Sequence, residues 1–386
     1  MSGVGESLLR ANPGYELVPM DRLGSAERQL LAELGEGDAY GLLRPRAGTS
    51  LEARTASADT ALLFLTLAEP APLPSYVRRR LGGEAEAVAV RLVLDGVLEL
   101  ADGDRHVSGP TAAALLTGAT SPRAGGRIGA LSAAALRYGE LLGPVAEHEL
   151  AMRLYFYGRQ PLTTALRERW DERSVAAHLG IDRVGAAREA LDAGWVEERA
   201  TEERHYWRSW RPRRPAGARD DRRANYKLYV SPTVEALPEA FAVVAEELPA
   251  VPGIAAFKVG RDAGGICRPD KLVAYFDRLE DLRQAAARLG QRLAGCQAHG
   301  IPFTAAIGED GLLSWGTDPP RSLTGGGSWR IWLAERLAEY LLRAGRDGRE
   351  AGEPSRFALG RLQLAGVDTD TWAPTAALWP AVQTGA

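Results

Sequence analysis

Beyond Tyr226, short apolar runs alternate with longer segments of helical periodicity, and this alternation restricts the fold more than any other feature of the chain. Short runs with alternating side chains are typical of strands, and apolar residues three or four positions apart are typical of amphipathic helices. The expected strands are Tyr226–Val230, Ala255–Val259, Leu272–Phe276, Phe303–Ile307 and Gly311–Trp315. The expected helices are Val234–Leu248, Leu279–Ala298, Trp329–Arg343 and Arg356–Ala365. The pattern predicts an α+β domain over residues 219–386, with an antiparallel or mixed sheet.

Two further regions and a linker precede this domain. Residues 14–118 combine short strand-like runs with three helical patterns and a hairpin that turns at Asp102-Gly103-Asp104, an order that predicts a winged-helix-like domain. Residues 119–129 are rich in Gly, Pro and Ser, as in a linker, and residues 130–210 carry mainly helical patterns. The aromatic run Tyr155–Tyr157 is interpreted either as core or as the lining of a peptide groove. The predicted fold class is α+β, with an N-terminal winged-helix-like domain, a helical middle and a C-terminal α+β domain.

The N-terminal region also bears on function. Its order of elements and the phrase LVLDGVLEL resemble the PqqD-like peptide-recognition elements of peptide-modifying enzymes. The resemblance implies that a leader peptide binds by adding a strand to a sheet edge. A winged helix that serves only in assembly has the same pattern, so both interpretations stay open.

Composition excludes several classes of function. The formal net charge is −3 and no long basic run is present, so a nucleic-acid partner has no bulk electrostatic support. The two cysteines, Cys267 and Cys296, form no CxxC pair, which fits a reducing compartment and speaks against a disulfide framework or a structural zinc site. No apolar stretch is long enough for a membrane span, and the N-terminus lacks a signal-peptide pattern. We expect a cytoplasmic protein without cofactor or metal.

The basic residues are distributed unusually. The chain has 44 arginines and three lysines, Lys227, Lys258 and Lys271, which fall within 45 residues of one another. A GC-rich genome explains the scarcity of lysine, but it does not explain the clustering. Arginine stays charged, whereas a desolvated lysine can act as a base near neutral pH. The three lysines are therefore candidates for chemistry that arginine cannot perform.

Strand alternation places several of these cations together. Neighbouring residues of a strand point to opposite faces of a sheet. If the apolar residues of the three strands face the helices, the opposite face of the sheet is lined by Lys227, Lys258 and Tyr275. The phrase Arg268-Pro269-Asp270-Lys271 enters the third strand and adds two cations and one carboxylate. The alternative is a solvated sheet face with an ordinary Arg–Asp pair.

A glycine run before the expected helix at Trp329 suggests an anion site. Gly325-Gly326-Gly327 leads into Ser328, which is a good N-cap residue. Backbone N–H groups at a helix start bind anions, and the helix dipole favours negative charge there. Arg330 in the first turn opposes the dipole, and a bound anion would remove the conflict. The alternative is a flexible loop with a capping serine.

Six phrases occur in the order and spacing of a known family: YKLYVS, AAFKVG, RPDKLVAYF, IPFTAAIGEDGL, GGSWRIWLAERLA and LAGVDTDTWAP. They resemble the HopA-type effector family, named after type III effectors of plant pathogens. Its actinobacterial relatives accompany kinase-like proteins in class V lanthipeptide and thioamitide biosynthesis, where they are taken to be phosphoserine or phosphothreonine lyases. The resemblance covers the C-terminal domain and, more weakly, the helical middle. This chain departs from the family's aromatic-glycine phrase, because Trp329-Arg330 follows Ser328 directly.

The resemblance implies a lyase that forms dehydroalanine or dehydrobutyrine in a phosphorylated precursor peptide, with a kinase-like partner subunit. Elimination requires a base for the α-proton, and positive charge on the developing enolate and on the departing phosphate. Lys258 is the expected base, because desolvation between apolar neighbours would lower its pKa. Arg268 is expected to bind the phosphate, with Asp270 orienting it. Lys227, Lys271 and Arg330 are expected to contact the phosphate or the enolate, and Ser328 to complete the phosphate cradle. Tyr275 or Tyr229 is expected to protonate the leaving group.

Within this enzyme the lysines can exchange roles. A histidine acid is not expected, because no histidine lies inside the six phrases.

Two alternatives to this enzyme remain open. The same cationic site in a non-catalytic module would hold a phosphopeptide or stabilise a kinase of the same pathway. A third possibility is an effector-like interaction protein with no small-ligand site.

Overall fold

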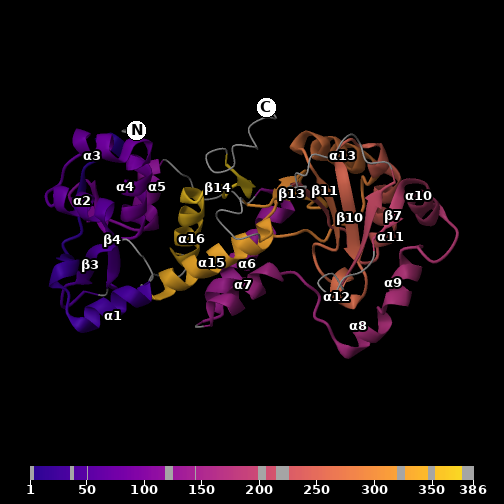
Figure 1. The fold of residues 1–386 in the computed structure, drawn as a ribbon, viewed down its shortest axis with the longest axis horizontal. Coiled ribbons are helices and arrows are strands. Elements are labelled where there is room, and N and C mark those ends of the chain that lie inside the picture. The colour runs from indigo at the N-terminus through magenta and orange to yellow at the C-terminus, as the bar shows by residue number, and fades with distance from the viewer. Residues whose placement is uncertain are drawn as a thin grey trace. The chain divides into compact units, whose positions relative to one another are not determined.

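In the computed structural model, the described residues are 4–34, 39–49, 51–117, 125–143, 145–198, 206–213, 226–319, 327–346 and 353–375. They form a mixed α+β structure with antiparallel sheets, which confirms the predicted fold class. The chain divides into two compact units, which consist of Met1–Ser121 with Glu339–Ala365 and of Pro122–Ala338 with Gly366–Ala386 (Figure 1). Each unit has a hydrophobic core of its own.

The first unit contains two three-stranded antiparallel sheets. The first has the order β1-β5-β6 and the second the order β2-β3-β4. Its strands are β1 (Leu9–Ala11), β2 (Tyr15–Pro19), β3 (Ala39–Pro45), β4 (Arg54–Ser57), β5 (Leu98–Asp102) and β6 (Arg105–Val107). Its helices are α1 (Ser25–Leu34), α2 (Ala58–Thr66), α3 (Ser75–Leu81), α4 (Ala85–Leu94), α5 (Pro110–Thr117) and, from the far end of the chain, α16 (Glu353–Leu364).

Several elements of this unit follow from local sequence. The side chain of Ser57 accepts a hydrogen bond from the backbone N–H of Thr60 and so caps α2. The β5–β6 hairpin turns at Gly103, whose φ of +60° suits glycine. The late helix α16 was not expected in this unit, where its Phe357 is fully buried in the core. The sequence pattern did not place α16 in this unit, because packing between segments far apart in the chain leaves no local signal in the sequence.

The second unit is built on one seven-stranded sheet, in the order β12-β13-β9-β11-β10-β8-β7, in which every neighbouring pair is antiparallel. These strands are β7 (Trp195–Glu197), β8 (Trp207–Pro212), β9 (Tyr226–Val230), β10 (Ile254–Gly260), β11 (Leu272–Phe276), β12 (Ala305–Ile307) and β13 (Leu313–Thr317). A separate two-stranded sheet pairs β14 (Val367–Asp368) with β15 (Ala373–Pro374).

The helices of this unit include the segments that shape the site. They are α6 (Gly126–Leu141), α7 (Glu147–Tyr155), α8 (Thr164–Arg169), α9 (Glu172–His178), α10 (Ala186–Gly194), α11 (Leu237–Glu247), α12 (Ala263–Ile266), α13 (Leu279–Arg292) and α15 (Trp329–Arg346), whose last eight residues belong to the first unit. Side chains from α11 and α13 pack with one face of the sheet in a single core. No helix in the described part of the chain is long and apolar enough to cross a membrane.

The structure corrects two details of the predicted boundaries. Strands β7 and β8 lie within the region expected to be mainly helical, yet they complete one edge of the sheet. The tryptophans of β8 lie on opposite faces of the sheet, and this pattern is typical of a strand. Trp210 stacks on Phe257 at 5.0 Å with an interplanar angle of 17°, while Trp207 points to the other face. In addition, α6 begins at Gly126, inside residues 119–129 that were expected to be a linker.

Candidate functional site

Lys227, Lys258 and Tyr275 share one face of the seven-stranded sheet. In the strand register, Lys227 of β9 pairs with Tyr275 of β11, and Lys258 of β10 pairs with Val273 of β11. The neighbouring residues Leu228 and Phe257 point the other way and are fully buried in the core. The structure thus confirms the placement that alternation predicts. We call the side chains of Lys227, Tyr229, Lys258 and Tyr275 the lysine face.

Aromatic rings surround the ammonium group of Lys258. Its Nζ lies 4.1 Å from the centroid of Trp207 and 5.6 Å from that of Tyr275. Both distances fit cation–π contacts. Lys258 and Tyr275 are half-buried, so this end of the lysine face is accessible to a solute. Trp207 also lies 5.2 Å from the guanidinium carbon of Arg268, and this ring therefore links Lys258 to the cluster described next.

Asp270 sits between two arginines. Arg268 donates from Nε to Oδ1 at 2.8 Å and from Nη2 to Oδ2 at 2.9 Å, which is a bidentate pair. Nη1 of Arg330 lies 2.9 Å from Oδ2 of the same carboxylate. All three residues are buried. Together with Tyr155 they form the arginine cluster.

The charges in the arginine cluster stabilise one another. Burial would raise the pKa of Asp270, but the neighbouring charges of Arg330 and Arg268 hold it well below its ordinary value. Burial also disfavours the charge of Arg268, and the opposite charge of Asp270 nevertheless raises its pKa. Arg268 and Asp270 therefore both stay ionised at neutral pH.

Tyr155, at the end of α7, fixes both arginines. Its hydroxyl accepts a hydrogen bond from Nη2 of Arg268 at 2.7 Å, and its backbone carbonyl accepts one from Nη2 of Arg330 at 2.6 Å. The guanidinium of Arg330 also lies 4.7 Å from the centre of the Tyr155 ring. Sequence reasoning singled out the aromatic run that contains Tyr155, but it did not connect the run to the arginines.

Arg330 retains donors that the protein does not use. Its exposed fraction is 2%, and its Nε and Nη1 have no hydrogen-bond partner among the described residues. The contact of Nη1 with Asp270 is an ion pair whose geometry does not make a hydrogen bond. A buried N–H group without an acceptor costs about 1–3 kcal/mol. This cost applies to Nε, since Nη1 already lies 2.9 Å from the carboxylate of Asp270.

A carboxylate of the chain occupies the start of α15. The backbone N–H of Trp329 donates to Oδ1 of Asp318 at 3.2 Å, and Lys227 donates to the same oxygen at 2.5 Å. Ser328 contributes its carbonyl, which accepts the first helical hydrogen bond from Trp332. The expected anion at this helix start is therefore an internal one at Trp329. Gly325 and Gly326 lie outside the described residues.

Tyr229 lies among the charges of the arginine cluster. Its side chain is 3% exposed, and burial raises the pKa of its hydroxyl well above the ordinary value. Arg330 and Asp270 are among the charged groups that act on it. Tyr229 therefore keeps its proton at neutral pH.

Lys271 pairs with a histidine and a backbone carbonyl. Its Nζ donates to the carbonyl of Pro232 at 2.8 Å and lies 2.9 Å from Nδ1 of His299. Nε2 of His299 lies 2.8 Å from the carbonyl of Gly158, so the proton is on Nε2 and Nδ1 accepts from the lysine. Burial lowers the pKa of Lys271 to about 7, and burial with the nearby lysine lowers that of His299 to about 4.

The lowered pKa of Lys271 predicts a pH-dependent stability. In the unfolded chain the lysine keeps its proton up to a pKa of about 10.5, so between pH 7 and 10.5 the unfolded state binds more protons. The free energy of unfolding should therefore rise with pH in this window, by about 2–3 kcal/mol from pH 7 to 9 at about 1.4 kcal/mol per pH unit. Denaturant titrations of the wild type and of Lys271→Met measure it. The difference between the two slopes of unfolding free energy against pH gives the contribution of Lys271. Equal slopes would contradict the lowered pKa of Lys271.

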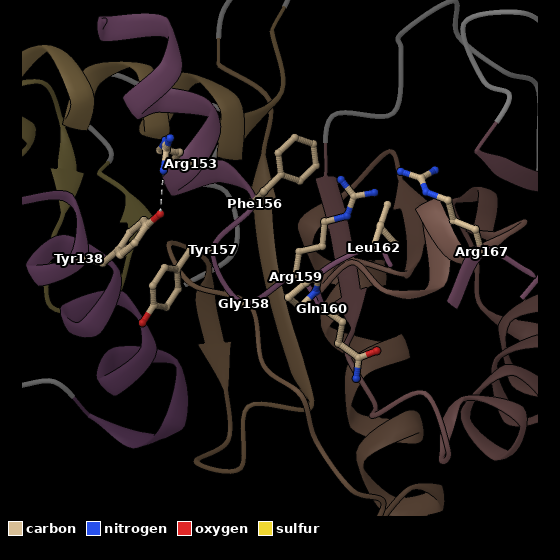
Figure 2. Close-up of a pocket in the computed structure, with 10 residues that line it drawn as sticks. Tyr138, Arg153, Phe156, Tyr157, Gly158, Arg159, Gln160, Leu162 and Arg167 are labelled. Atoms are coloured by element: carbon tan, nitrogen blue, oxygen red, sulfur yellow. Dashed lines mark hydrogen bonds between the residues drawn. The ribbon is translucent and has the colours of Figure 1, made fainter. Parts of the chain in front are cut away.

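A pocket of about 550 Å³ lies beside the site (Figure 2). It is lined by the end of α7, the loop that follows it and parts of α6 and α8. Phe156 belongs to its wall and also contacts the arginine cluster, because the centre of its ring lies 5.1 Å from the guanidinium carbon of Arg268. In the described part of the chain, no group of three His, Cys, Asp or Glu side chains is placed to hold a metal ion.

Comparisons with known proteins return only distant structural similarity. No protein-family model and no curated protein matches the chain. An effector protein from Pseudomonas syringae pv. tomato strain DC3000 is 12% identical, with 63% of this chain and 97% of that chain covered and a TM-score of 0.38. A phosphothreonine lyase effector from Chromobacterium violaceum, VirA (SpvC), is 19% identical over 32% of this chain and 65% of that chain, with a TM-score of 0.27.

A third example is the type III effector and phosphothreonine lyase OspF from Shigella flexneri. It is 15% identical, with 38% of this chain and 85% of that chain covered and a TM-score of 0.29. The solved structures similar to this chain thus include effectors and phosphothreonine lyases, at low identity and with partial coverage.

Proposed function

We propose that the lysine face and the arginine cluster form the active site of a phosphoserine/phosphothreonine lyase. The observation that supports this most strongly is the Nε–H group of Arg330, which has no hydrogen-bond partner among the described residues and is buried beside a second arginine. A phosphate has the charge and the several acceptor oxygens that such donors require. Asp270 and Tyr155 hold both guanidinium groups in place before the ligand arrives.

The proposed reaction is a β-elimination. Lys258, in its neutral form, takes the α-proton of the phosphorylated residue, and the released electron pair forms the Cα–Cβ double bond. The Cβ–O bond breaks, and its electrons leave on the phosphate. Arg268 and Arg330 stabilise the charge of the departing phosphate, and Lys227 stabilises the enolate oxygen. Protonation of the leaving group falls to Tyr229 or Tyr275, which both line this face.

We propose a narrower set of roles for the lysines than the sequence alone allowed. Lys271 is fully buried and engaged by Pro232 and His299, so we assign it a positioning role rather than a phosphate contact. Its low pKa would suit a base, but a base must first reach the proton that it abstracts. Lys258 satisfies that condition better, because it is half-buried whereas Lys271 is fully buried.

The proposed substrate is a phosphorylated ribosomal precursor peptide, and the proposed product contains dehydroalanine or dehydrobutyrine. A kinase-like partner would supply the phosphorylated residue, because elimination consumes what such a kinase makes. In this proposal the first unit binds the leader peptide, and the antiparallel sheets there offer strand edges for it. The competing candidate is a module of the same pathway that holds the phosphopeptide or the kinase without chemistry.

One experiment separates the two candidates. The full chain is incubated with a phosphothreonine peptide and the products are analysed by mass spectrometry. A lyase is expected to give a peptide that has lost phosphoric acid and that adds a thiol at the new double bond. A stable complex that retains the phosphate favours the binding module, and no binding at all contradicts both.

A further inference from the structure

Aromatic rings lie between the cations of the site. The ring centre of Tyr275 lies 5.8 Å from Nζ of Lys227 and 5.6 Å from Nζ of Lys258. The ring centre of Trp207 lies 4.1 Å from Nζ of Lys258 and 5.2 Å from the guanidinium carbon of Arg268. The face of an aromatic ring attracts a cation, so each ring holds two cations near each other although their charges repel.

The backbone of β8 places Trp207 beside Lys258. In the strand register Trp207 pairs with the residue two positions after Lys258, which makes the two side chains diagonal neighbours on one face of the sheet. The preceding carbonyl, of Tyr206, accepts a hydrogen bond from the backbone N–H of Arg261 at 2.9 Å. A Cβ atom on Gly265 would lie 2.6 Å from the same carbonyl oxygen, so α12 approaches this strand too closely for a side chain. The indole therefore extends from a backbone that is held on two sides.

Charges of both signs act on Lys258. The charged and titratable groups near it are Arg268 and Asp270 just before β11, Tyr275 within β11 and Lys227 on β9. Asp270 favours the charged form of Lys258, whereas the neighbouring cations disfavour it. From β8, the facing residues are Ser209, which is uncharged, and Trp207. On this side of Lys258 it is therefore the indole that stabilises the ammonium group.

We propose that Trp207 is a positioning residue, whose ring holds the base Lys258 and the phosphate-binding Arg268 at a fixed separation before the substrate binds. The inference rests on the proposed function, since it takes these two residues in those roles. Elimination needs both groups at once, because the α-proton and the departing phosphate belong to one residue of the substrate. The contact that places Lys258 also stabilises its ammonium form, and the lysine is therefore harder to deprotonate.

The variant Trp207→Leu should change the rate of elimination and its pH dependence in distinct ways. Loss of positioning should lower the plateau of kcat/KM by about 10–100-fold. Loss of the ring favours the neutral amine, so the acid limb of the pH profile should move to lower pH by about 0.5–1 unit. Trp207→Phe keeps a ring and should restore part of the rate and most of the pH profile. A lower rate with an unmoved acid limb would overturn the proposal, because a merely structural role has that result.

Acetylation of Lys258 tests the same contact without turnover. The chain has three lysines, so mass spectrometry after treatment with a trace of acetic anhydride reports on each of them separately. Only the neutral amine reacts, and labelling of Lys258 near neutral pH should therefore be about three- to tenfold faster in Trp207→Leu. Lys227, which is paired with Asp318 and does not contact Trp207, serves as the internal reference. Unchanged labelling of Lys258 would overturn the proposal.

Trp170→Leu is the matched control. Trp170 is also half-buried and has a cation 5.1 Å from its ring, that of Arg169, but it packs against the core on the other face of the sheet. This variant should leave both the acid limb and the labelling of Lys258 unchanged. Faster labelling in Trp207→Leu, when the wild type does not eliminate phosphate, would contradict the lyase while supporting the contact. Elimination by the wild type, with unchanged labelling and an unmoved acid limb in Trp207→Leu, would contradict the role of Trp207 alone.

Discussion

Replacement of Lys258 by arginine is expected to lower kcat/KM for phosphate elimination by about 10³-fold, within the range for loss of a general base. Arginine keeps the positive charge beside Trp207 and Tyr275, but it cannot give up its proton near neutral pH. Binding of the phosphopeptide should change by no more than about threefold, because the electrostatic attraction is retained. Steady-state rates and anisotropy titrations on the same protein measure the two effects separately.

The matched control is Lys227→Arg. Lys227 lies on the same sheet face and its contribution is charge, held by the ion pair with Asp318 at 2.5 Å. Arginine preserves that charge, so the expected loss is about tenfold or less. If Lys258→Arg retains most of its activity while Lys227→Arg loses it, the two lysines exchange roles. If both variants remain active, neither lysine is the base.

Replacement of Asp270 by asparagine is expected to destabilise the second unit by about 3–5 kcal/mol, the usual cost of removing one partner from a buried ion pair. The change leaves Arg268 and Arg330 as neighbouring buried cations without their shared carboxylate. For a domain of this size the melting temperature should fall by about 10 °C. Differential scanning calorimetry in phosphate-free buffer measures the loss, since added phosphate would itself bind the two cations that have lost their carboxylate.

Asp281→Asn provides the comparison for this variant. Asp281 is also nearly buried, at 6% exposure, but burial raises its pKa rather than lowering it. Its charge is therefore not stabilised by the fold, and the expected change in stability is about 1 kcal/mol or less. A melting temperature for Asp270→Asn close to that of Asp281→Asn would show that the arginine cluster does not depend on its carboxylate.

Local alternation was sufficient to predict the central strands and the shared face of the lysines. The side-chain period of a strand is two, so Lys227, Lys258 and Tyr275 were placed without knowledge of any distant contact. Arg268 and Asp270 are two positions apart, and their pairing was also within reach of local reasoning. These predictions needed only the identity of neighbouring residues.

The residues that sequence reasoning missed are joined to the site over long separations. Tyr155 reaches Arg268 across 113 positions, and His299 reaches Gly158 across 141. Asp318 caps α15 and holds Lys227 across 91 positions, although the glycine run suggested a site for an external anion. Such contacts depend on how helices and loops pack onto the sheet, and a single sequence carries no periodic signal for them. The aromatic run Tyr155–Tyr157, which starts at the last residue of α7, was the one feature of the sequence that pointed to this region.

The most direct test of the central claim is phosphate release from a phosphothreonine peptide in water enriched in ¹⁸O. Elimination breaks the Cβ–O bond, so the account predicts inorganic phosphate without ¹⁸O and a peptide with a new double bond. Hydrolysis at phosphorus would instead place ¹⁸O in the phosphate and restore the threonine hydroxyl. Mass spectrometry of both products distinguishes these outcomes, and labelled phosphate or a peptide that keeps its phosphate would contradict the assignment of this site as a lyase.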